Sequence, residues 1–250
     1  MKWSCGLFLI WSHAAAQFAE PILTRSAIPI PAGTVSLKLD FVSPVDAKTK
    51  INSQTVPESF LEIGLGRGFE TVLQWPLLRV SEPGGSSVLA AGQFSIALRY
   101  LLAGSPASSY AIAIAGRVEM PSGDSHIVGN EIQLMPTILA EWHTAADLLL
   151  RSNLAWNTTI AGTTGRFAFL EYSNAAVWLA SRHWMPVIEL VGSTNTVRGG
   201  TQMIVQPEII VAPSRHLELK TGLSLGVVST SRYTIRSQLA WVWGKRTGAP

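Results

Sequence analysis

The chain has 250 residues, of which 47% are hydrophobic and only 14% are charged, with a net charge of +3 from 19 basic and 16 acidic residues. Soluble domains carry about 25% charged residues, so a soluble exterior would be short of charge here, and the mild, scattered positive charge gives no reason to expect a nucleic-acid partner. Beyond the first residues no apolar run reaches the roughly 18 residues of a membrane-spanning helix, which leaves the closed β-barrel as the structure that could cross a bilayer.

Residues 1–16 have the pattern of a secretory signal peptide, with Lys2 before an apolar segment and three small residues, Ala14 to Ala16, before the expected cleavage site. A short buried strand is the alternative. Cys5 is the only cysteine and would leave with the signal, so the mature chain would have no thiol. Three prolines in residues 17–32 favour an extended conformation, and we expect this range to form a periplasmic arm.

The remaining chain alternates apolar and polar residues with a period of two, which is typical of strands whose two faces meet different surroundings. The clearest example is Leu61 to Leu77, where two alternating arms flank Arg67 and Gly68 and predict a β-hairpin. Phe167 to Trp178 is the least regular, because either parity leaves Asn174 or the pair Glu171 and Ser173 facing outward. The pattern predicts about twelve strands, at residues 35–41, 61–66, 69–77, 94–100, 110–119, 132–142, 148–157, 167–178, 188–190, 203–211, 217–225 and 233–243.

The connections between these strands are alternately long and short. Long loops are expected at 43–57, 80–91, 121–130, 158–166, 194–200 and 227–232, and short turns at 67–68, 103–107, 143–145, 180–182 and 213–214. A bacterial barrel has long outer loops and short periplasmic turns in this alternation, whereas a soluble β-sandwich has no reason for it. The fold we predict is all-β: a transmembrane up-and-down antiparallel β-barrel, with residues 33–243 as the barrel and 244–250 as a C-terminal tail.

Tryptophan placement and two prolines bear on this fold. Seven tryptophans fall near predicted strand ends, as in the aromatic girdles at membrane interfaces; they are Trp75, Trp142, Trp156, Trp178, Trp184, Trp241 and Trp243. Tryptophans of a soluble core are the alternative.

Pro136 and Pro207 lie inside predicted strands, where each removes a ladder hydrogen bond, and they predict bulges or different strand boundaries.

Charged residues fall on the face of the strands that would point into the barrel. The lumen-lining candidates are Lys38, Asp40, Glu62, Glu70, Arg99, Arg117, Glu119, Glu141, Arg151, Glu189, Glu208, Glu218, Lys220 and Arg236. Buried charges must be paired or hydrated, so these side chains either hold the barrel shut or line a water path. Both interpretations remain open, because a barrel of about twelve strands is intermediate in size between small filled barrels and open porins. A soluble lipocalin-type barrel would reverse the two faces, and the low charge fraction opposes it.

Enzyme signals are weak. Gly222 to Gly226 matches the nucleophile-elbow pattern, but that motif needs a strand-to-helix turn and here it lies inside an alternating strand. His126 lies beside Asp124 and Ser125, and adjacent residues rarely aim at one another as a triad requires. The remaining histidines lack metal-ligand spacing. We therefore expect that the protein is not an enzyme and that it has no cofactor and no metal site.

Four short pieces resemble a bacterial family of outer-membrane transporters named for the meta-pathway of phenol degradation. They are Ala32 to Leu37, Leu61 to Glu70, Gly92-Gln93-Phe94 and Pro121 to Asp124. In the third piece the family usually has Asp where this chain has Gln93. The resemblance implies a barrel of the cell outer membrane that passes small hydrophobic compounds, aromatic ones among them, and implies no catalytic residues. We therefore expect the lipid bilayer and a small-molecule cargo as partners, and a passive channel or transporter as the function. The alternative is a structural or surface-interaction barrel whose lumen is closed by salt bridges.

Overall fold

The computed structural model describes residues 23–44, 53–81, 87–123, 130–145, 147–162, 168–181, 183–197, 199–228 and 233–244. The expected signal peptide at 1–16, residues 17–22, the loop residue His126 and all but the first residue of the expected tail at 244–250 lie outside these ranges. Among the described residues no helix is long and apolar enough to cross a membrane.

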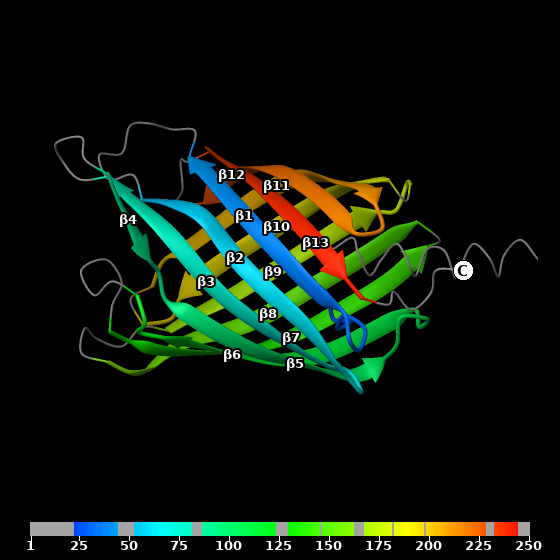
Figure 1. Cartoon of the computed structure of the whole chain (residues 1–250), viewed down its shortest axis with the longest axis horizontal. Helices are drawn as coiled ribbons and strands as arrows, with labels where there is room; N and C mark the ends of the chain where they lie inside the picture. Colours follow the sequence, from blue (N-terminus) through cyan, green and yellow to red (C-terminus); the bar gives the residue numbers. More distant parts are fainter. Residues whose placement is uncertain are drawn as a thin grey trace, which may run out of the picture.

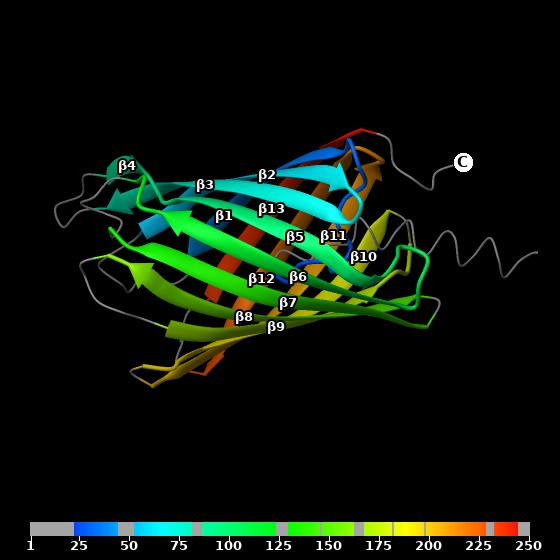
Figure 2. The ribbon, with the colours of Figure 1, turned by 90° about the horizontal axis from the view of Figure 1, so that it is seen from below.

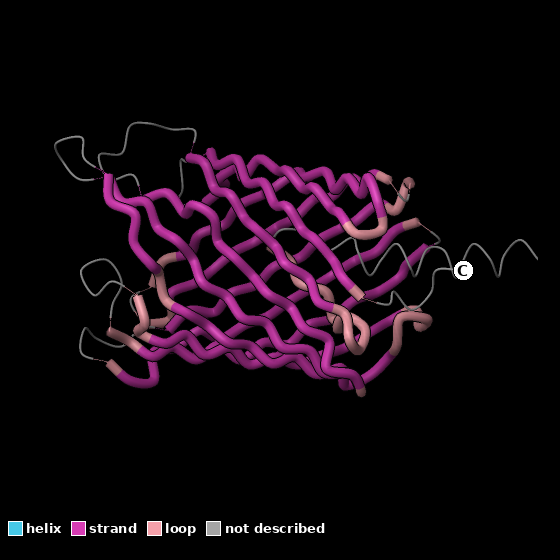
Figure 3. The backbone as a smooth tube through the Cα atoms, in the orientation of Figure 1, coloured by secondary structure: helices cyan, strands magenta, loops and turns pink. Residues whose placement is uncertain are grey.

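The described residues form strands joined by turns and loops (Figure 3). The strands are β1 (Val35–Pro44), β2 (Ser53–Gly66), β3 (Phe69–Ser81), β4 (Ser87–Ala91), β5 (Phe94–Gly104), β6 (Tyr110–Met120), β7 (Ile132–Ala145), β8 (Leu148–Ala161), β9 (Ala168–Trp178), β10 (Trp184–Asn195), β11 (Thr201–Ser214), β12 (Leu217–Val228) and β13 (Tyr233–Trp243).

All neighbouring strands are antiparallel, and the sheet closes because β1 pairs with both β2 and β13 (Figures 1 and 2). β3 pairs with β4 along Leu77–Ser81 and with β5 along Phe69–Gln74, so β4 and β5 together act as one strand of the wall. The thirteen described strands therefore form a barrel of twelve. The predicted all-β, up-and-down antiparallel barrel of about twelve strands is confirmed.

Several strands are longer than the sequence predicts. β2 begins at Ser53, inside the expected loop 43–57, β4 occupies part of the expected loop 80–91, and β10 spans twelve residues where only three alternate clearly. Ladder hydrogen bonds form between backbone groups and do not need apolar side chains. A strand can therefore continue where the apolar pattern has ended.

The turn at Arg67 and Gly68 forms as predicted. Arg67 has a φ of 50° and Gly68 a φ of 80°, and positive φ at both central residues is the geometry of the type I′ hairpin turn. Leu101 N donates to Gly68 O at 2.9 Å, which joins this turn to β5.

The two faces of the wall differ in the way the alternation predicts. On β12, Glu218, Lys220 and Ser224 are buried inside, while Leu219 and Leu223 are exposed outside. On β9, Ser173 is buried and Asn174 is exposed, so Asn174 is the polar residue that faces outward.

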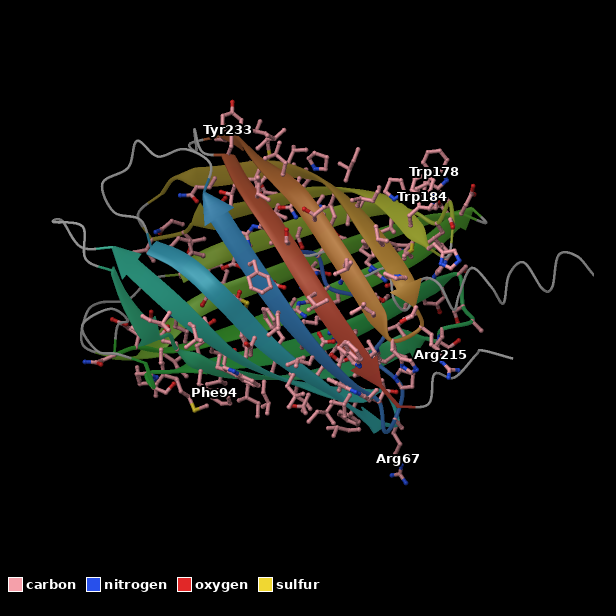
Figure 4. The ribbon with its side chains drawn as sticks, turned by 45° about the horizontal axis from the view of Figure 1, so that its top comes forward. Arg67, Phe94, Trp178, Trp184, Arg215 and Tyr233 are labelled. Carbon is pink, nitrogen blue, oxygen red and sulfur yellow. The ribbon has the colours of Figure 1, made fainter. Side chains whose placement is uncertain are left out.

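All seven tryptophans of the expected girdle are on the exposed outer face. Trp178 and Trp184 lie together at the end of the barrel that carries the short turns, and Tyr233 lies at the opposite end of the barrel (Figure 4). Trp75 and Trp156 lie farther from their strand ends than expected, because β3 continues to Ser81 and β8 to Ala161. That these rings lie at the lipid interfaces stays a prediction.

The expectation of bulges at Pro136 and Pro207 is wrong. The ladder between β7 and β8 omits Met135 and Pro136 but resumes at Thr137 in the register it had at Leu134. The ladder between β11 and β12 likewise continues in register across Pro207. Both prolines are on the exposed face, and the wall tolerates a missing N–H at each because the strands are held by many other ladder bonds.

The outer face allows a test with two matched isoleucines. Ile138, in the middle of β7, and Ile160, one residue before the end of β8, are 55% and 56% exposed. A cation on the lipid face of a barrel costs about 2–4 kcal/mol at the bilayer midplane and about 0–1 kcal/mol near the interfaces. We expect Ile138→Arg to destabilise the folded barrel by that larger amount and Ile160→Arg by the smaller one, measured by urea unfolding in lipid vesicles. Equal effects would show that this face does not meet lipid.

Candidate functional site in the barrel lumen

The interior of the barrel holds all fourteen charged residues predicted to face inward. Eleven of them are buried: Lys38, Asp40, Glu62, Glu70, Arg99, Glu141, Arg151, Glu189, Glu208, Glu218 and Lys220. Arg117, Glu119 and Arg236 are partly buried. The alternation of side chains along each strand brings these residues to the inner surface, because every second residue points inward.

Ion pairs connect many of these residues along the wall. Arg99 Nη2 lies 2.8 Å from Glu70 Oε1, and Arg151 Nε lies 2.8 Å from Glu141 Oε2. In both pairs the two residues are directly opposite on neighbouring strands, where cross-strand side chains are close enough to interact. Three more pairs join Lys38 to Glu62 at 2.7 Å, Arg117 to Glu119 at 2.8 Å and Lys220 to Glu218 at 3.7 Å.

Residues 23–30, which we call the lumen segment, lie inside the barrel and donate to its buried carboxylates. Thr24 N donates to Glu189 Oε1 at 2.7 Å, Ser26 Oγ to Glu141 Oε2 at 2.9 Å and Ile30 N to Glu70 Oε2 at 2.7 Å. We expected residues 17–32 to be a periplasmic arm; over the described part the chain instead enters the lumen. The wall carboxylates explain this position, because buried acceptors require donors and the backbone of an extended segment supplies them.

The side chain of Arg25 and the backbone carbonyl of Ser26 make further contacts between the lumen segment and the wall. Arg25 Nη1 lies 2.9 Å from Glu62 Oε1, and its guanidinium carbon is 4.8 Å from the centre of the Phe60 ring. Arg99 Nη1 donates to Ser26 O at 2.6 Å. Arg99 and Glu62 therefore bind the wall and the lumen segment at the same time.

A small apolar patch receives the middle of the lumen segment. Ala27 and Ile28 are buried with Ala111, Ala113 and Leu139, which point inward from β6 and β7. A second buried apolar cluster lies at inward positions of β8 to β11, so apolar inward residues in the sequence indicated that parts of the interior are packed and not lined by charge alone. At the base of the segment, a Cβ added to Gly64 would lie 2.0 Å from Pro31 O, so only glycine permits this close approach.

A cavity of about 290 Å³ lies beyond the lumen segment, toward the end of the barrel that carries the long connections. Leu23 and Arg25 form part of its lining, together with Phe60, Arg117 and Arg236. Arg117 lies near the end of β6 and Arg236 near the start of β13, and both of these ends are at the long connections. The segment thus contacts the wall on the side of the short turns, at Glu70 and Glu141, and the cavity lies on the side of the long connections.

Side-chain amides complete the polar lining, in addition to the fourteen charged candidates. Gln238 donates to Asp40, Gln74 donates to Glu58, and Gln206 donates to both Glu189 and Glu208 at 3.0 and 3.2 Å. Their inward parity could have identified them. The list of lumen-lining candidates contained charged residues only, so these amides were not in it.

The residues weighed for chemistry do not converge. Gly222 to Gly226 lies within strand β12, and Ser224 is buried and donates to Gln206, so the turn that a nucleophile elbow needs is not formed there. His143 Nε2 is 3.6 Å from Glu141 Oε1, and His216 Nδ1 is 2.9 Å from Val242 O. Among the described residues no group of three or more His, Cys, Asp or Glu side chains could hold a metal ion.

A closed barrel with an apolar outer face and a charged interior defines the outer-membrane class of β-barrels, and comparison with solved structures agrees. The chain is similar to an outer membrane channel from Pseudomonas putida F1, with a TM-score of 0.71 at 10% identity over 90% of this chain and 99% of that one. It is also similar to the NanC porin (TM-score 0.58, 8% identity, 83% and 98% covered) and the KdgM porin (TM-score 0.58, 9% identity, 84% and 99% covered). At these identities the likeness establishes the fold.

No family model matches the sequence, and the search of curated proteins gives no match. The expected membership of the phenol-degradation transporter family is therefore supported only at the level of an outer-membrane β-barrel fold.

Proposed function

We propose that the protein is a passive channel or transporter of the cell outer membrane, which passes small molecules, hydrophobic and aromatic ones among them, and that the lumen segment closes it in the state described. The observation that carries this proposal is that the closing element is not part of the wall. Residues 23–30 occupy part of the lumen without adding a strand to the sheet.

The direction of the ion pairs favours a channel over a structural barrel closed by salt bridges. Glu70 with Arg99 and Glu141 with Arg151 join neighbouring strands, so these pairs lie along the wall and do not span the lumen. The contacts that reach into the lumen are made through the lumen segment, chiefly by Arg25 and Ser26. Without the segment, charged side chains would line the wall around an open space.

The lumen segment can leave without breaking the barrel. Its contacts are hydrogen bonds, ion pairs and apolar packing with wall side chains, while each wall strand is held by the backbone ladders of its neighbours. Two backbone bonds at its base, Gly33 N to Gly64 O at 3.0 Å and Gly64 N to Thr34 O at 2.9 Å, keep the connection to β1 fixed. Displacement of residues 23–30 would thus open the lumen and leave the start of the barrel in place.

Deletion of residues 23–30 tests this function. We expect the variant to assemble as a heat-modifiable barrel and to show several-fold higher single-channel conductance in planar bilayers than the intact protein, because the obstruction is absent. Vesicles that contain the variant should also take up small aromatic solutes faster. A folded variant without conductance or uptake would contradict the channel and support a structural barrel.

A further inference from the structure

The cavity next to the lumen segment contains one arginine, Arg236, that no described residue neutralises. Among the described residues, the Arg236 guanidinium has no hydrogen-bond or ion-pair partner, and its Nε is buried. The side chain as a whole is partly buried, and a buried guanidinium N–H without an acceptor is unfavourable. This site therefore lacks an anion.

The register explains why the wall does not supply this anion. Arg236 on β13 lies opposite Val42 on β1 and Gly222 on β12. Neither residue can accept a hydrogen bond through its side chain, whereas Arg99 and Arg151 each lie opposite a carboxylate on one neighbouring strand, Glu70 and Glu141.

The other charges of the cavity already have partners. Arg25 pairs with Glu62 at 2.9 Å, and Arg117 pairs with Glu119 at 2.8 Å. The carboxylates of the cavity accept from amides: Asp40 from Gln238, Glu58 from Gln74, and Glu171 from Asn157 at 3.5 Å. Of the charged residues that line the cavity, Arg236 alone is left to bind a ligand, within the part of the chain that the structure describes.

We propose that this cavity binds a small monocarboxylate with an apolar body, whose carboxylate pairs with Arg236. A guanidinium matches a carboxylate through two parallel hydrogen bonds. The three carboxylates of the lining disfavour a doubly charged phosphate, while Leu23, Phe60 and Val191 offer an apolar surface. About 290 Å³ is close to the lower limit of about 300 Å³ for ligand pockets, which suits a single ring. This proposal rests on the proposed function, since it names the class of cargo that a channel would receive from the side of the long connections.

Calorimetry with benzoate and benzyl alcohol on the folded, detergent-purified full chain tests the site. Both probes have one aromatic ring, and only benzoate is charged. We expect benzoate to bind at least ten-fold more tightly than benzyl alcohol, and Arg236→Gln to abolish that difference. Arg236→Lys should restore part of the preference, because it keeps the charge and loses the paired geometry. Arg215→Gln is the matched control, since Arg215 is exposed at the opposite end of the barrel (Figure 4) and its loss should leave the preference unchanged.

The results separate this proposal from the channel itself. Equal binding of the two probes, or a preference that survives in Arg236→Gln, would overturn the carboxylate site even if the protein conducts. A preference for benzoate that depends on Arg236 supports the site even if no conductance is measured. Gel mobility before and after boiling confirms that each variant is folded, so that loss of binding cannot come from loss of the barrel.

Discussion

Replacement of Arg151 by methionine should destabilise the folded barrel by about 3–5 kcal/mol, because it leaves the buried carboxylate of Glu141 without its main partner. Arg151 and Glu141 are 1% and 0% exposed, and their side chains are joined at 2.8 Å. Ser26 and His143 remain near Glu141, at 2.9 and 3.6 Å, but a hydroxyl and a more distant imidazole do not replace a guanidinium. The measurement is urea unfolding in vesicles, followed by tryptophan fluorescence.

Two further variants separate the charge effect from the loss of packing. The double variant Arg151→Met, Glu141→Met should recover most of the lost stability, because a buried ion pair exchanged for apolar side chains leaves no unpaired charge. Arg117→Met should cost below about 1 kcal/mol, since its pair with Glu119 is partly exposed, with side chains 28% and 19% accessible. A loss in Arg151→Met no larger than in Arg117→Met would show that the Glu141 pair is hydrated and that the lumen is open to water at this level.

The alternation of side chains made the wall predictable. A period of two depends only on the geometry of a strand, and it assigned the interior face of Lys220 on β12 and of Glu70 on β3 without knowledge of the strand partners. Strand ends were less predictable. β2 continues outward to Ser53 and β8 to Ala161, and the polar runs 53–55 and 157–159 give no alternation to follow.

The lumen segment was the part that alternation could not reveal. Its residues make no ladder with the wall, and the prolines at 21, 29 and 31 indicate an extended chain without fixing its location. The clue lay in the wall itself, where Ala113 and Leu139 are apolar at inward positions. Apolar inward residues also recur on β8 to β11, so they indicate a packed interior without identifying the segment that packs against them.

The partners of the interior charges were predictable only in part. Arg99 and Glu70 lie on strands that are consecutive in the wall, yet β4 separates them in the sequence, so their register could not be counted from a single hairpin. Arg236 shows the opposite case. Its inward position follows from parity, but the absence of an acceptor beside it follows only from the register that places Val42 and Gly222 there.

The double variant Glu62→Gln, Glu70→Gln should both open the channel and weaken the barrel. Glu62 accepts from Arg25 of the lumen segment at 2.9 Å and from Lys38 of the wall at 2.7 Å. Glu70 accepts from the backbone of Ile30 at 2.7 Å and from Arg99 at 2.8 Å. Neutral amides weaken all four contacts, so the lumen segment loses two of its anchors while Lys38 and Arg99 lose their counter-charges.

We expect higher single-channel conductance, a shift of selectivity toward anions and a lower melting temperature, with a loss on the order of 3 kcal/mol per broken pair. The shift toward anions follows because carboxylates in a pore favour cations. Glu119→Gln is the control: its carboxylate pairs with Arg117 and has no contact with the lumen segment among the described residues, so conductance should change little. Planar-bilayer recordings and a melting curve are taken on the same preparations. No conductance before or after the double change, together with a lower melting temperature, would exclude the channel and leave a barrel whose interior charges serve only to hold it closed.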